Sequence, residues 1–197
     1  MTVGQLITAT ELSEYLKDSS KKIRVVDGTW FSPNGKKGVD NYLKGHIPGS
    51  VHFDIDTCVT PSDYEMMLPS ESVFADYVGN LGIDNDTHVV VYNDHPSFAL
   101  FSAPRVWWTF RAFGHNAVSI LDGGLRTWKD AKFDISTGQE TVTPATFTPK
   151  LKQSFIKSFD DVKVNIEKKE FQLVDARPTP RFEGKAPEPR EGEFNVV

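Results

Sequence analysis

Short apolar runs alternate with amphipathic stretches over residues 6–131. Apolar runs predict buried strands at 23–26, 88–92 and 117–121, and a further short strand is expected at 50–53. Apolar residues three to four positions apart predict helices at 10–16, 70–81, 103–113 and 125–131. The first helix would be capped by Thr10, and Gly114 would end the third. The polar, glycine-rich stretch 31–49 carries no predicted element.

The alternation of helices with buried strands indicates an α/β fold. Fully apolar strands such as 88–92 are buried on both faces, which is typical of parallel sheets covered by helices. We therefore expect a mainly parallel sheet flanked by helices.

The pattern changes after residue 135 and then begins again. Residues 136–154 are rich in Thr, Ser, Pro and Gln, which predicts an extended interdomain linker. Residues 155–162 then repeat the pattern of 6–12, and Leu173-Val174-Asp175 repeats the Val-Val-Asp end of the first strand. After Asp175 the chain has four prolines and no further strand or helix pattern. We expect one complete domain at 5–135, a linker at 136–154, and an incomplete second copy, a helix and a strand, at 155–197.

Composition and charge exclude several functions. The chain of 197 residues is 39% hydrophobic and 25% charged, as globular proteins are. A net charge of -5 gives no electrostatic basis for nucleic-acid binding. No apolar run approaches the ~20 residues of a membrane span, and the N-terminus lacks the features of a secretory signal. We expect no nucleic-acid or membrane partner and a cytoplasmic location.

A single cysteine, Cys58, is the only candidate thiol nucleophile. One cysteine excludes an intramolecular disulfide and a cysteine-rich zinc site, and no metal site is expected. Asp54 and Asp56 lie close to it in sequence, and neighbouring carboxylates raise the pKa of a thiol. We expect an unreactive or merely oxidisable thiol rather than a sulfur carrier.

Several motifs resemble those of the two-domain rhodanese-like sulfurtransferases, the thiosulfate and 3-mercaptopyruvate sulfurtransferases. They are GHIPG at 45–49, VVVY at 89–92, SAPRVWW at 102–108, FGH at 113–115, LDGGL at 121–125 and PEPR at 187–190. The resemblance covers about residues 5–190. It implies a rhodanese-like fold and transfer of a sulfane sulfur from thiosulfate or 3-mercaptopyruvate to cyanide or a thiol. The sulfur would pass through a cysteine persulfide, without metal or organic cofactor. Family members occur in mitochondria too, so the mitochondrion is the alternative location.

The chain departs from the family at the catalytic loop. In the family, the catalytic cysteine lies in the loop after a central strand of the second domain. The corresponding first-domain loop, 93–99 (NDHPSFA), holds no cysteine, and the second copy ends about 100 residues short by comparison with the first. The chain is therefore predicted to be truncated before the catalytic cysteine and inactive on its own.

The resemblance also suggests binding residues. Arg181 and Arg190 match the family's arginines that hold the carboxylate or sulfonate of a small sulfur-donor anion, for which a guanidinium is suited. His46, in GHIPG, matches a first-domain histidine that faces the active site across the domain interface and would support catalysis. In this chain alone, a loop histidine with a backbone partner, and arginines in solvent, are the competing interpretations.

Other interpretations remain open at this point. Asp94, His95 and Ser97 contain the residue types of a hydrolase triad, but residues so close in sequence rarely reach its geometry. A non-catalytic rhodanese-like module could bind a homologue or another protein at a domain interface left unpaired around Trp108. A splice product or gene-model fragment would show the same features.

Overall fold

The computed structural model describes residues 4–31, 37–62 and 66–187. Contacts divide the chain into two units, the first ending at Ile156 and the second beginning at Lys157. Arg190 lies outside the described residues.

The first unit is built around a five-stranded parallel sheet. The strands β1 (Leu6–Ile7), β2 (Ile23–Asp27), β3 (Val51–His52), β4 (His88–Tyr92) and β5 (Val118–Leu121) lie in the order β1-β5-β4-β2-β3. Every pairing between them is parallel, and the full length of β2 is paired with β4. The apolar pattern of 88–92 thus predicted the central strand with its bounds.

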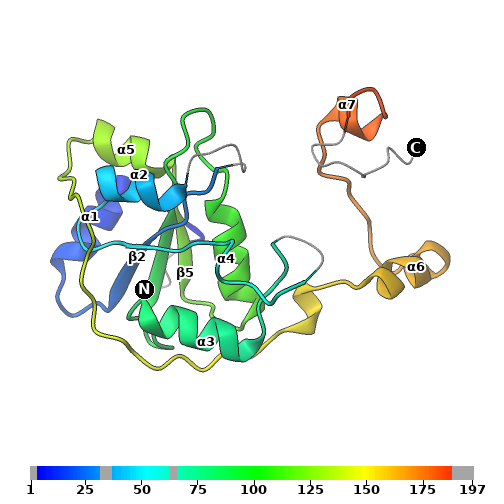
Figure 1. Cartoon of the computed structure of the whole chain (residues 1–197), viewed down its shortest axis with the longest axis horizontal. Coiled ribbons are helices and arrows are strands. Elements are labelled where there is room, and N and C mark those ends of the chain that lie inside the picture. Colours follow the sequence, from blue (N-terminus) through cyan, green and yellow to red (C-terminus); the bar gives the residue numbers. More distant parts are fainter. Residues whose placement is uncertain (1–3, 32–36, 63–65, 188–197) are drawn as a thin grey trace. The chain divides into compact units, whose positions relative to one another are not determined.

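Helices cover both faces of this sheet (Figure 1). On one face α3 (Glu71–Asn80) and α4 (Ala103–Ala112) pack against Val89 and Val91. On the other face α1 (Ala9–Lys17) and α5 (Gly124–Asp130) pack against Val90 and Tyr92. Successive residues of β4 therefore enter opposite cores, as the alternation of side chains along a strand requires.

Two elements of the first unit were not predicted. Helix α2 (Gly38–Lys44) forms within the polar stretch 31–49 and is anchored by Tyr42, which is fully buried and donates its hydroxyl to the carbonyl of Ser50. Strand β1 is only two residues long and exists because β5 pairs with it. Neither periodicity nor propensity marks such short elements, because tertiary contacts stabilise them.

The capping residue of α1 was predicted wrongly. Thr8, not Thr10, caps the helix: its hydroxyl accepts from the Glu11 N–H, and the Glu11 carboxylate accepts from the Thr8 N–H at 2.9 Å. This reciprocal arrangement is a capping box. Gly114 takes the predicted role and follows α4 at φ +85°. Helix α3 is capped by Ser70, whose hydroxyl accepts from the Val73 N–H.

The extended segment 136–154 packs along the first unit before a single 3₁₀ turn at Gln153–Phe155. Phe147 from this segment is 4% exposed and packs edge-on against Phe74 of α3 at 5.6 Å between ring centroids. The N–H of Ala145 donates to Gly79 at the end of α3, and that of Lys150 to Phe113. We call residues 136–154 the strap.

The second unit contains α6 (Phe159–Lys168) and α7 (Thr179–Phe182). Helix α6 was predicted, and Ser158 caps it with Asp161 as the reciprocal partner. The strand expected at 173–176 is not formed: Leu173 and Val174 are 68% and 80% exposed, and no described strand pairs with them. Among residues 157–187 no side chain is buried, so nothing compensates for ordering an isolated strand.

Candidate functional site

The loop after β4 lies where parallel α/β folds bind ligands, at the carboxyl ends of the strands. It runs from Asn93 to the start of α4, and Asn93 organises it. The Asn93 side-chain oxygen accepts from the N–H groups of Phe101 and Ala103 at 3.0 and 3.2 Å. Its amide nitrogen donates to the carbonyl of Phe98 at 3.3 Å. These N–H groups are thus occupied by Asn93 and do not point together at an anion.

Aromatic rings cover this loop. His95 lies 5.2 Å from Phe98 and 4.6 Å from Phe101, measured between ring centroids. Trp30, from the loop after β2, stacks on Phe101 at 6.1 Å. Phe98 and Phe101 remain 55% and 42% exposed, so the carboxyl edge of the sheet presents an aromatic surface. Trp108, expected in an unpaired interface, is half-buried beneath the Arg105 guanidinium at 4.8 Å.

The structure does not assemble the hydrolase triad. Nδ1 of His95 accepts from the backbone N–H of Ser97, not from its hydroxyl. The Asp94 carboxylate instead accepts from Asn41 at 3.0 Å and lies 3.4 Å from the Lys129 ammonium. His95 therefore has no orienting carboxylate from Asp94 and no relay to a nucleophile.

A buried polar cluster supports the neighbouring loop. Asp27, at the end of β2, is fully buried and accepts from the Thr29 N–H at 2.8 Å. Nδ1 of His52 lies 3.8 Å from the same carboxylate oxygen. Burial, and then the Asp27 charge, raise the pKa of Tyr92 well above its usual value. Asp27 thus has a structural role, because it holds the start of the loop that follows β2.

His46 is fully buried and has its own partners. Its ring stacks on Tyr42 at 4.1 Å between centroids, and Nδ1 donates to the Tyr42 carbonyl at 2.9 Å. Nε2 lies 3.3 Å from Oε1 of Glu140 in the strap. Glu140 also accepts from the Gly49 N–H, and this hydrogen bond, followed by the contact with His46, lowers its pKa. Sequence reasoning missed Glu140, because nothing in a polar stretch marks one carboxylate as a partner of a distant histidine.

The predicted donor-binding arginine lies in the second unit. Arg181 is in α7 and is half-buried. Arg177 pairs with Asp175 at 2.7 Å, and its hydrogen bonds are the main cause of the lowered pKa of Asp175; the charge of Arg181 contributes further. Arg181 therefore belongs to a small charged cluster at the position where the strand was expected.

Cys58 lies in the core, 3% exposed and packed with the apolar residues under α3 and α4. Burial, with a smaller effect of the Asp54 charge, raises the pKa of its thiol to about 12. A thiol with such a pKa is not ionised near neutral pH, so it is a poor nucleophile. Within the described ranges, no three metal-ligating side chains come together, and no helix is long and apolar enough to cross a membrane.

These features coincide with a known family. The profile of the rhodanese-like domain matches residues 8–131, and the chain therefore belongs to the rhodanese-like family. It is 46% identical to the 3-mercaptopyruvate sulfurtransferase of Mus musculus over 191 residues, which cover 95% of this chain. It is also 46% identical to the thiosulfate sulfurtransferase of Cricetulus griseus over 187 residues, or 93% of this chain. These matches span 64% and 63% of those relatives, so this chain corresponds to less than two thirds of their length.

Solved structures agree with the sequence relatives. The SseA protein of Escherichia coli, described with the rhodanese fold of 3-mercaptopyruvate sulfotransferases, superimposes with a TM-score of 0.85 at 33% identity. That match covers 98% of this chain and 73% of SseA. Tum1 of Saccharomyces cerevisiae matches with a TM-score of 0.84 at 29% identity, covering 97% of this chain and 66% of Tum1. The predicted rhodanese-like fold is confirmed.

Proposed function

We propose that this chain is part of a sulfurtransferase that moves a sulfane sulfur from thiosulfate or 3-mercaptopyruvate to cyanide or a thiol. The 46% identity to a 3-mercaptopyruvate sulfurtransferase over nearly the whole chain supports this proposal most directly. In the proposed reaction with thiosulfate, a cysteine thiolate attacks the outer sulfur, and sulfite leaves with the electron pair of the S–S bond. Cyanide then attacks the persulfide, which releases thiocyanate and restores the thiolate.

We further propose that residues 1–197 do not perform this chemistry by themselves. Cys58 is buried, and its thiol pKa is raised to about 12, so attack on a donor would require exposure and ionisation of a core residue. The loop after β4 holds no cysteine, and Asn93 occupies two of its N–H groups. In this proposal residues 5–135 form the non-catalytic domain of the sulfurtransferase. Arg181 and Arg190 then bind the carboxylate or sulfonate of the sulfur donor.

A sulfurtransferase assay on the purified chain tests the inactivity. Thiosulfate or 3-mercaptopyruvate is the donor, cyanide the acceptor, and the mouse relative the positive control. We expect no turnover above buffer from the chain or its Cys58→Ser variant. Turnover that Cys58→Ser abolishes would make Cys58 the persulfide carrier and contradict the proposal.

A chimaera tests the family activity. The chain is fused to the remaining C-terminal part of the mouse 3-mercaptopyruvate sulfurtransferase. We expect the fusion to transfer sulfur, and Arg181→Met to raise KM for the donor at least about tenfold, because a charged hydrogen bond to the substrate is lost. Lys185→Met is the matched control: Lys185 lies in the same segment and pairs with Glu183. A folded but inactive chimaera, or equal effects of the two substitutions, would count against the proposed activity or the role of Arg181.

The exposed apolar surface at Phe98, Leu100 and Phe101 favours a second candidate, a non-catalytic module that binds a homologous rhodanese-like domain. Size-exclusion chromatography with light scattering, with and without the mouse relative, distinguishes it. A mixed complex that Phe98→Ser weakens would support this function. A monomer that stays separate from the relative would exclude it for this pair.

A further inference from the structure

A cavity lies away from the loop after β4. It measures about 440 Å³ and is formed by the C-terminal half of α1, the end of α5 with the residues that follow it, and Pro48. In a parallel sheet each connecting helix runs back against its strands, so the C-terminal ends of α1 and α5 lie towards the amino edge. The aromatic loop lies at the opposite, carboxyl edge. The cavity is therefore separate from the loop after β4.

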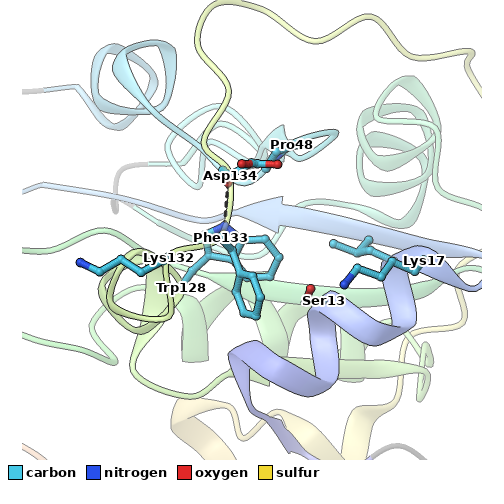
Figure 2. Close-up of a pocket in the computed structure, with 8 residues that line it drawn as sticks. Ser13, Lys17, Pro48, Trp128, Lys132, Phe133 and Asp134 are labelled. Carbon is cyan, nitrogen blue, oxygen red and sulfur yellow. Dashed lines mark hydrogen bonds between the residues drawn. The ribbon is translucent and has the colours of Figure 1, made fainter.

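An apolar wall forms one side of this cavity. The rings of Trp128 and Phe133 pack at 4.7 Å between centroids with 47° between their planes, and Leu16 and Pro48 extend the apolar lining. The indole N–H of Trp128 donates to the Asp134 carbonyl at 2.8 Å, which fixes the ring (Figure 2). Trp128 is only 4% exposed, so a flat ligand ring would find its aromatic contact mainly on the half-buried Phe133, which Trp128 supports from the core.

Two hydrogen-bond donors face the same space. Figure 2 shows the Ser13 hydroxyl and the Lys17 ammonium turned into the cavity, whereas Lys132 extends away from Ser13. Ser13 is only 7% exposed, and its hydroxyl makes no hydrogen bond with the described residues. This hydroxyl is available to donate a hydrogen bond to a ligand acceptor in the cavity. Lys17 makes no ion pair within the same ranges.

We propose that this cavity binds a small aromatic monocarboxylate. The ring would pack against Trp128 and Phe133, and the carboxylate would accept from the Lys17 ammonium and the Ser13 hydroxyl. The cavity volume lies within the range of small-molecule sites, which is roughly 300–1,000 Å³. The Asp134 carboxylate at the rim opposes a second negative charge, which favours a monoanion over a dianion.

Titration of the 197-residue chain with indole-3-acetate tests this proposal, and the neutral indole-3-acetamide serves as the matched ligand. Binding is followed by ¹H–¹⁵N NMR, in which the Trp128 indole signal reports on the cavity. We expect saturable shifts with the acid and at least about fivefold weaker binding of the amide, because only the acid pairs with an ammonium. No saturation up to about 10 mM acid, or equal binding of the amide, would overturn the proposal.

Variants locate the binding site and separate it from effects on folding. Lys17→Met should weaken binding about fivefold, whereas Lys21→Met, which alters a lysine paired with Asp18 outside the cavity, should leave it unchanged. Ser13→Ala should weaken binding about threefold. Asp134→Asn should tighten it about twofold, because a repulsive charge is removed while the carbonyl that holds Trp128 remains. Equal affinities of the Lys17 and Lys21 variants, each with a native-like spectrum, would contradict the assignment.

Discussion

At the scale of single residues, Asn93 shows how one side chain determines what a loop can do. A loop that leads into a helix N-terminus can bind an anion with its N–H groups. Here the Asn93 side chain accepts from two of them and also donates to Phe98, so the loop is stabilised from within. Sequence reasoning identified the loop and its missing cysteine, but the role of Asn93 depends on a folded loop that no local pattern encodes.

Cys58 gives the first residue-scale prediction. With its thiol pKa raised to about 12 and the side chain in the core, alkylation by iodoacetamide at about pH 8 should be at least about 100-fold slower in the folded chain than in urea. Mass spectrometry of timed samples measures both rates. For comparison, Ser97→Cys in a Cys58→Ser background places a thiol on an exposed loop, and it should react quickly when folded. Rapid alkylation of Cys58 in the native chain would show that the core opens readily.

At the scale of elements, the apolar pattern predicted the helices and strands that pack into the core. It missed the short elements that are stabilised by single tertiary contacts. Strand β4 was predicted with its bounds, and α3 within one residue at each end, because burial on a sheet or a helix face repeats along the sequence. Helix α2 depends on the burial of Tyr42, and β1 on pairing with β5. The expected strand at 173–176 failed for the converse reason: it has the right composition but no described neighbour to pair with.

The contacts that hold the strap should depend on pH, because they include the carboxylate of Glu140. The Gly49 N–H and His46 lower the pKa of Glu140 below its ordinary value of 4.5 in the folded chain. A carboxyl group with a depressed pKa stabilises the fold above its unfolded pKa, and this contribution is lost as pH falls through the folded pKa. Glu140→Gln should therefore destabilise the chain at neutral pH by about 0.5–1 kcal/mol, because Glu140 is partly exposed, and less at about pH 3.

Urea denaturation at both pH values measures this difference. Glu170→Gln provides the control, since Glu170 is an exposed carboxylate of the second unit. It should change stability little at either pH. An identical loss for Glu140→Gln at neutral and acidic pH would mean that its charge is not what holds the strap.

At the scale of the whole molecule, the strap contributes a buried side chain to the core of the first unit, whereas the second unit buries none of its described residues. The sequence predicted a domain at 5–135 followed by a linker, because Thr, Pro and Gln give no periodic pattern. In the structure the strap contributes Phe147 to the core between α3 and α4, and the contact division falls after Ile156. By contrast, every described residue from 157 to 187 is at least partly exposed. A buried residue in an irregular segment cannot be recognised from a sequence pattern. By contrast, the apolar pattern that begins at residue 155 predicted a helix, and the structure has one at Phe159–Lys168.

Two truncations distinguish these boundaries. A chain ending at Ile156 keeps all of the described core and should melt within about 3 °C of the full chain, because the removed residues bury nothing. A chain ending at residue 135 loses Phe147 and Glu140, and it should be destabilised by at least about 3 kcal/mol, as expected when a buried aromatic ring leaves a core. Calorimetry gives both values. If the two truncations melt together, the strap is a linker as the sequence suggested; if the longer one also melts far below the full chain, residues 157–197 stabilise the first unit.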